Sequence, residues 1–200
     1  MTLSTDNHRS DLRSGLYSLL TGCWLLLSLL APVQAHGGPV STEYTLKAAL
    51  IFKLTRFVTW PAGRETRNDG KFGICLLGRD DFGATLDALQ GRTVNGAPIV
   101  VDRFSQSDAI GDNCQVVIIS DSKRAFIEPI TRALSDRPIL TIGDSRRFAD
   151  QGGMIQFVRH DQKIGFIINL QQATVAGLKI AAPLLELATI VGHGSGGTKK

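Results

Sequence analysis

Four short stretches of the sequence contain residue types that could carry out chemistry. "GRDDFG", Gly78–Gly83, follows an apolar run at the place where a dinucleotide-binding loop would lie. "GDS", Gly143–Ser145, is similar to the turn that carries a hydrolase nucleophile. "HGG", His36–Gly38, is similar to an oxyanion-hole loop, and His160 next to Asp161 forms a titratable pair.

Each stretch lacks a part that its chemistry requires. An aspartate takes the place of the second glycine in the dinucleotide fingerprint, and Asp80 and Asp81 would repel a phosphate, so we interpret them as helix caps. No Asp-x-x-His element follows Ser145 to supply a base, and no G-x-S-x-G motif accompanies "HGG". The pair His160–Asp161 falls in a predicted hairpin turn. The sequence therefore favours a binding protein over an enzyme, and no cofactor is predicted.

The first 35 residues have the composition of a secretory signal peptide. Arg9 and Arg13 precede an apolar run from Leu16 to Leu30, and Val33-Gln34-Ala35 fits the small-residue pattern of a cleavage site. We predict a mature chain that begins at His36. An uncleaved anchor is the alternative, although the run is shorter than the roughly twenty residues that a spanning helix needs.

The cysteine count supports cleavage. Lipidation at Cys23 is a second alternative, but most of the apolar run follows this cysteine. Removal of the leader leaves Cys75 and Cys114, an even number in an oxidising compartment, which predicts one disulfide. Two buried free thiols are the competing interpretation. A metal site would need more ligands close by, and the histidines are scattered.

The charge pattern argues against a nucleic-acid partner. The formal net charge of +4 is spread along the chain, without a Lys/Arg run interleaved with aromatic residues.

Helical and extended patterns alternate with short connections from Ser41 onward. This predicts a single α/β domain over residues 36–191, a mostly parallel sheet flanked by helices with a C-terminal antiparallel hairpin, and a flexible tail at 192–200. A first helix is expected over residues 42–59, because Pro61 disfavours helical backbone at Trp60. Lys47 interrupts its apolar arc and is expected to snorkel. The residues of that arc are Leu46, Leu50, Ile51, Leu54, Phe57 and Val58.

Six apolar runs predict the strands. Helices are expected near residues 81–90 and 122–135, the second with a kink or a late start at Pro129. A break is expected near residues 177–182, with Pro183 in the first turn of a final helix. The predicted strands are "FGICLL" from Phe72, "APIVV" from Ala97, "QVVIIS" from Gln115, "PILTIG" from Pro138, "GMIQFV" from Gly153 and "KIGFIIN" from Lys163.

Several segments together resemble the YfiR-like family of bacterial periplasmic proteins, over nearly the whole mature chain. The most specific are the Trp-Pro after the first helix, the Phe-Ala-x-x-Gly-Gly-Met-Ile segment and the ending from Ile-Asn-Leu to Leu-x-x-Ala. The matching segments are "KAALIFKLTRFVTWP", "GICLLG", "CQVVIIS", "ILTIGDSRRFADQGGMIQFV" and "KIGFIINLQQATVAGLKIAAPLLELA".

The resemblance implies a non-catalytic periplasmic regulator that tends to dimerise. In the family it binds the periplasmic sensor region of an inner-membrane diguanylate cyclase and holds the cytoplasmic GGDEF domain inactive, so that release raises cyclic di-GMP and favours biofilm formation. In some systems an outer-membrane lipoprotein sequesters the repressor. A periplasmic small-ligand-binding protein is the alternative function.

The chain departs from the family pattern at two places. Ile167 stands where the family often has Glu, so a role for that carboxylate is lost here. No second cysteine pair lies near Gly152 and Gly153, which puts redox sensing through that pair in doubt. Both glycines are predicted to lie in a turn that requires positive φ.

Four residues are candidates for partner binding. Trp60 could anchor a partner, because aromatic residues dominate interface hot spots, or it could close the core. Asn169 could bind a partner or cap the following helix. Leu178 and Lys179 belong to a segment that could be an exposed apolar patch or pack inside.

Overall fold

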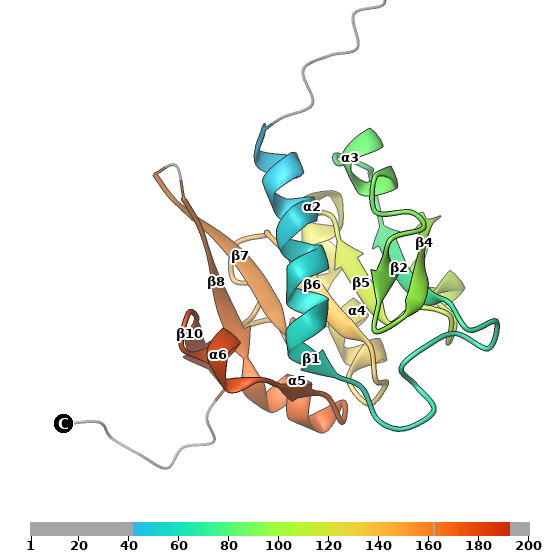
Figure 1. The fold of residues 1–200 in the computed structure, drawn as a ribbon. Coiled ribbons are helices and arrows are strands. Elements are labelled where there is room, and N and C mark those ends of the chain that lie inside the picture. The colour runs from blue at the N-terminus through green and yellow to red at the C-terminus, as the bar shows by residue number, and fades with distance from the viewer. Residues whose placement is uncertain (1–41, 162, 193–200) are drawn as a thin grey trace, which may run out of the picture. The chain divides into compact units, whose positions relative to one another are not determined.

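The computed structural model describes residues 42–161 and 163–192 (Figure 1). The predicted signal peptide, its cleavage site, Cys23 and most of the predicted tail lie outside the described residues. The helices are α2 (Thr42–Leu54), α3 (Ala84–Asp87), α4 (Ile127–Leu134), α5 (Leu170–Val175) and α6 (Ala182–Leu185). Three 3₁₀ turns span Thr55–Phe57, Ser107–Ala109 and Asp121–Phe126.

An eight-stranded sheet forms the centre of the domain. Its strands lie in the order β10-β8-β7-β6-β5-β2-β4-β3, and neighbours run parallel except in the hairpins β7–β8 and β3–β4. The strands are β2 (Phe72–Leu77), β3 (Thr93–Val94), β4 (Ala97–Phe104), β5 (Val116–Ile119), β6 (Leu140–Gly143), β7 (Ile155–His160), β8 (Lys163–Asn169) and β10 (Thr189–Val191). This confirms the predicted α/β class and the antiparallel hairpin.

The predicted end of the first helix is wrong. The helix ends at Leu54, and after a 3₁₀ turn the strand β1 (Val58–Thr59) pairs with β9 (Lys179–Ile180) in a separate two-stranded sheet. β1 and β9 are far apart in the sequence, so no local pattern predicts their pairing. The break predicted near residues 177–182 is where β9 lies, and Pro183 stands in the first turn of α6 as expected.

The helix predicted near residues 81–90 is reduced to the single turn α3. Asp80 Oδ1 accepts hydrogen bonds from the backbone N–H groups of Phe82 and Gly83, which precede α3. No side chain caps the first turn of α3, so the predicted capping role of Asp80 is wrong. Asp81 does not cap this helix; its carboxylate pairs with Arg79. The helix α4 begins late, as predicted, and places Pro129 in its first turn.

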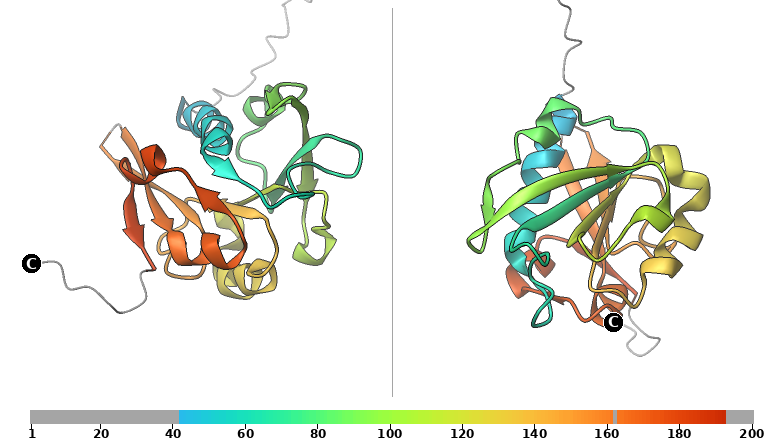
Figure 2. Two further views of the ribbon diagram at one scale, coloured as in Figure 1. Left: turned by 60° about the horizontal axis from the view of Figure 1, so that its bottom comes forward. Right: turned by 90° about the vertical axis from the view of Figure 1, so that its right-hand side faces the viewer.

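Apolar side chains fill both faces of the sheet. Along β2, Ile74 and Leu76 belong to the core layer beneath α2, whereas Cys75 and Leu77 belong to the layer beneath α4. Figure 2 shows α2 and α4 on opposite sides of the sheet. Because both faces are covered there, the central strands β2 and β5 are buried at every position and read as continuous apolar runs.

Candidate functional site

Two of the predicted partner-binding residues lie in the core. Trp60 is only 4% exposed; its ring packs edge-on against Phe72, and its Nε1 donates a hydrogen bond to the carbonyl of Gln115 at 3.2 Å. Leu178 is also buried. A partner could reach either side chain only if the chain opened, so their role in binding stays a prediction.

Asn169 and Lys179 differ in exposure. Asn169 is buried at the end of β8, where its Oδ1 accepts the N–H of Gln172 at 3.1 Å and caps α5. Its Nδ2 donates to the carbonyl of Ala149 at 2.9 Å. Lys179 is exposed and lies opposite Thr59 in the β1–β9 pair. Of the four predicted residues, Lys179 is the one whose side chain faces solvent.

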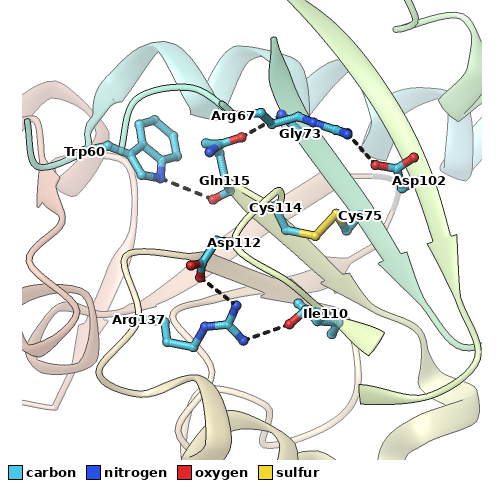
Figure 3. Close-up of a disulfide and its surroundings, with 10 residues drawn as sticks. All are labelled: Trp60, Arg67, Gly73, Cys75, Asp102, Ile110, Asp112, Cys114, Gln115 and Arg137. Atoms are coloured by element: carbon cyan, nitrogen blue, oxygen red, sulfur yellow. Dashed lines mark hydrogen bonds and ion pairs between the residues drawn. A yellow bond between two sulfur atoms is a disulfide. The ribbon is translucent and has the colours of Figure 1, made fainter. Parts of the chain in front are cut away.

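The predicted disulfide is present between Cys75 and Cys114, whose Cα atoms are 5.8 Å apart. Both residues are buried. The bond fastens the loop that precedes β5 to the centre of β2 (Figure 3). Next to it, Gln115 Oε1 accepts the backbone N–H of Gly73 at 2.7 Å. This environment excludes water, so the pair serves as a structural cross-link in this conformation.

Polar side chains cluster at the carboxyl ends of β5 and β6. The connection after β2 leads to the α2 side of the sheet, whereas the connection after β5 leads to α4 on the other side. Such a reversal is where α/β proteins commonly bind ligands. Here the polar groups bond to one another. Ser145 Oγ donates to Asp121 Oδ1 at 2.9 Å, and the remaining space holds about 20 Å³, room for one water.

Lys47 closes this cluster. Its side chain does not snorkel as predicted: the residue is 5% exposed, and its Nζ lies 2.6 Å from Glu43 Oε1 and 2.5 Å from Asp144 Oδ2. Burial alone would lower the pKa of Lys47, but the hydrogen bonds to Asp144 and Glu43 outweigh it and raise that pKa. The hydrogen bond from Lys47 lowers the pKa of Glu43. The "GDS" turn therefore supplies an ion-pair partner rather than a nucleophile.

Two apolar residues that the predicted arc placed in the core are exposed. Leu46 of α2 is 42% exposed, and Phe57, in the 3₁₀ turn after α2, is 39% exposed. Leu50 is half-buried and packs against the same core layer as Ile164 and Phe166 of β8. We call the set Leu46, Leu50, Ile164 and Phe166 the α2–β8 surface. Arg159 of β7 faces Ile164 of β8 across the hairpin. The ion pair of Arg159 with Glu43 holds the first turn of α2 beside this hairpin.

A family model with the description YfiR/HmsC-like matches residues 44–189, which cover the described domain almost completely. The chain belongs to the YfiR/HmsC-like family. A search of curated proteins finds no match. The matched span of this YfiR/HmsC-like chain includes the disulfide, the Lys47–Asp144 ion pair and the α2–β8 surface.

Gly152 and Gly153 of this YfiR/HmsC-like chain serve different purposes. Gly152 has a φ of 89°, which confirms the predicted turn. Gly153 has no positive φ; a Cβ there would lie 2.1 Å from the ring of Phe148, so close packing is what requires glycine. The expectation of positive φ at Gly153 is wrong for this reason.

Within residues 42–161 and 163–192, no helix is long and apolar enough to cross a membrane. In the same part of the chain, no group of three or more His, Cys, Asp or Glu side chains is arranged to hold a metal ion. Sequence reasoning missed the Lys47 cluster and the α2–β8 surface. A lysine inside an apolar arc was the one signal that pointed to the cluster.

Proposed function

We propose that this chain is a non-catalytic periplasmic regulator that binds the periplasmic sensor region of an inner-membrane diguanylate cyclase and represses it. The observation that carries the proposal is the match to the YfiR/HmsC-like family over residues 44–189. Repression would lower cyclic di-GMP and restrain biofilm formation. The regulator acts after removal of residues 1–35 and works as a homodimer, and an outer-membrane lipoprotein can sequester it.

The structure supports a binding role in two ways. The polar groups at the carboxyl ends of β5 and β6 are engaged with one another, as in the bond between Ser145 and Asp121, rather than directed into a cavity. The α2–β8 surface leaves apolar side chains such as Leu46 in contact with solvent. The buried disulfide suits an oxidising compartment such as the periplasm.

Among the four predicted contact residues, we assign direct contact to Lys179, because its side chain is exposed. Trp60, Asn169 and Leu178 would not touch the partner; they would stabilise the fold that presents the contact surface. The hydrogen bond from Trp60 to Gln115 and the cap that Asn169 provides for α5 are the contacts through which they would act.

The experiment is a gene deletion with complementation. Deletion should raise cellular cyclic di-GMP severalfold, and the full chain should restore the low level. A version that begins at residue 36, without the leader, is the matched control and should not restore it, because the regulator and the sensor region would then lie on opposite sides of the membrane. In parallel, cross-linking in intact cells should capture a membrane protein with a GGDEF domain. An unchanged level together with no such capture would refute the proposal.

A groove beside α4 favours a second candidate function, the binding of a small polar ligand. The groove measures about 620 Å³ and is lined by charged and amide side chains, among them Arg132, Arg147 and Gln172. A small-molecule thermal-shift screen tests this candidate. A ligand that raises the melting temperature of the wild type, but not of an Arg132→Ala/Arg147→Ala variant, would support it; a screen without a hit would count against it.

A further inference from the structure

The strand β8 is only partly covered at the edge of the sheet. On one side, β7 pairs with it from Lys163 to Ile168. On the other side, β10 pairs only with Ile167–Asn169. Figure 1 shows the β7–β8 hairpin extending well beyond β10 and α6. Lys163–Phe166 therefore have no strand partner on the outer side within the described residues.

The backbone of this open segment directs hydrogen-bonding groups outward. The N–H of Asn169 donates to the carbonyl of Met154 at 2.8 Å, so Asn169 faces β7. Orientation alternates along an antiparallel strand, so Gly165 and Ile167 also face β7. The N–H groups of Ile164 and Phe166 then point away from the sheet. Such groups are a template for pairing with another chain.

The side chains next to this edge would offer apolar contacts to an incoming strand. Ile164 and Phe166 are half-buried and pack against the core layer that Leu50 also joins. Leu46 of α2 is 42% exposed to solvent. A strand added at the edge would place alternate side chains on the same face as Ile164 and Phe166, next to α2. The α2–β8 surface could therefore bury one or two apolar side chains of that strand.

Exposed charged residues stand at this edge. Lys163 begins the open segment and has no ion-pair partner in the described part of the chain, and the exposed Asp161 lies two residues before it in the hairpin turn. Arg159 is also exposed, although it pairs with Glu43 at 2.9 Å. An acidic residue in the incoming strand would be attracted to this site.

We propose that the Lys163–Phe166 edge of β8 receives an extended segment of the partner protein, in which apolar residues alternate with acidic ones. Main-chain hydrogen bonds to Ile164 and Phe166 supply affinity, and the α2–β8 surface and Lys163 select the sequence. The identity of the partner in this proposal rests on the proposed function: the segment would belong to the periplasmic region of the diguanylate cyclase.

A second copy of this chain fits the edge less well. If two β8 strands paired about a two-fold axis at Gly165, residue 163 would face residue 167, which Thr189 already occupies, so β10 limits the pairing to residues 164–166. An axis at Ile164 avoids β10 but brings the two hairpin tips side by side. Lys163 of one copy would then lie near Lys163 of the other, and these like charges would repel.

The test uses the mature chain, residues 36–200, and the synthetic peptide EVEVEVE with blocked ends. Amide exchange measured by NMR should slow by about tenfold or more at Ile164 and Phe166 when the peptide is added, because exposed amides become hydrogen-bonded. The peptide KVKVKVK is the matched ligand control and should cause no slowing. Lys163→Glu should weaken binding of EVEVEVE by about five- to tenfold, whereas Lys71→Glu, at the far end of β2, should leave it unchanged.

The same exchange measurement with the purified periplasmic region of the cyclase separates the two proposals. If the peptide slows exchange at Ile164 and Phe166 but the cyclase region does not bind, the strand site is supported and the proposed function is contradicted. If the cyclase region binds while the two amides exchange as in the free chain, the proposed function stands and the strand site is overturned. Unchanged exchange with both ligands overturns the strand site as well.

Discussion

The Nζ of Lys47 lies 2.5 Å from Asp144 Oδ2, a contact that joins α2 to the end of β6 across 97 positions of the sequence. A second carboxylate, Glu43, lies one helical turn away at 2.6 Å. A buried ammonium is tolerated only where such partners compensate for the lost water. The contact therefore fixes the first helix of the domain against the carboxyl end of the sheet.

Replacement of Lys47 by Met should destabilise the domain. The substitution leaves the Asp144 and Glu43 carboxylates without their cation; both are partly exposed, so water offsets some of the loss, and we expect about 1–3 kcal/mol. Urea unfolding of the mature chain measures the change. Lys53→Met, on the exposed side of the same helix, is the control and should stay within about 0.5 kcal/mol of wild type. Equal effects of the two substitutions would contradict a stabilising role for the buried pair.

Glu43 makes the stability depend on pH. Its hydrogen bond with Lys47 lowers its pKa below the usual 4.5, so its contribution is fully present above pH 4.5 and is lost as the pH falls through the lowered pKa. Glu43→Gln should cost less than about 1 kcal/mol at neutral pH, and the difference from wild type should shrink toward zero in strong acid. Urea unfolding of both proteins at the two pH values is the measurement. If the stability difference between Glu43→Gln and wild type grew in acid, the pKa of Glu43 would be raised rather than lowered by folding.

Gly153→Ala should disrupt the packing around Phe148. The new Cβ would lie 2.1 Å from the fully buried ring of Phe148, so we expect a loss of about 1–3 kcal/mol. Gly111→Ala is the matched control, because its Cβ would meet nothing within 4 Å and its φ is not positive. Thermal and urea unfolding compare the two variants. A Gly153→Ala protein as stable as Gly111→Ala would refute the packing argument.

The disulfide should resist reduction while the domain is folded. Both cysteines are buried, so a thiol reductant reaches them only after local opening. The rate of alkylation after treatment with dithiothreitol, followed by mass spectrometry, should rise steeply with added urea. A Cys75→Ala/Cys114→Ala variant should lose about 2–4 kcal/mol of stability, because the bond joins residues 39 positions apart. Rapid reduction in native buffer would instead identify the bond as a redox-responsive element.

Asn169 and Lys179 should separate structural support from partner contact. Asn169→Ala removes the cap of α5 and the hydrogen bond to Ala149, so it should cost about 1–2 kcal/mol while the folded protein still binds the cyclase region. Lys179→Glu should leave stability unchanged and weaken binding. Both are checked by urea unfolding and by binding to the purified cyclase region. Normal binding by Lys179→Glu would remove Lys179 from the contact surface.

The sequence by itself determined the fold class and the positions of the longer strands. Runs such as Phe72–Leu77 are apolar at every position because helices cover both faces of the sheet, and that pattern is visible without a structure. The β7–β8 hairpin was also predictable, since the short polar stretch "RHDQ" from Arg159 joins two adjacent apolar runs. The even pair Cys75 and Cys114 predicted the disulfide from the cysteine count and the leader.

The tertiary structure decided what depends on distant partners. Val58–Thr59 became a strand because Lys179–Ile180 lie beside it, whereas the apolar arc and the stop at Pro61 had favoured continuing the helix. Periodicity placed Lys47 in an apolar arc, but it could not reveal the Asp144 carboxylate that lets a lysine be buried there. The open edge at Ile164 exists because β10 stops short of it. Such features arise from where segments meet in space, and one-dimensional patterns record only the neighbours along the chain.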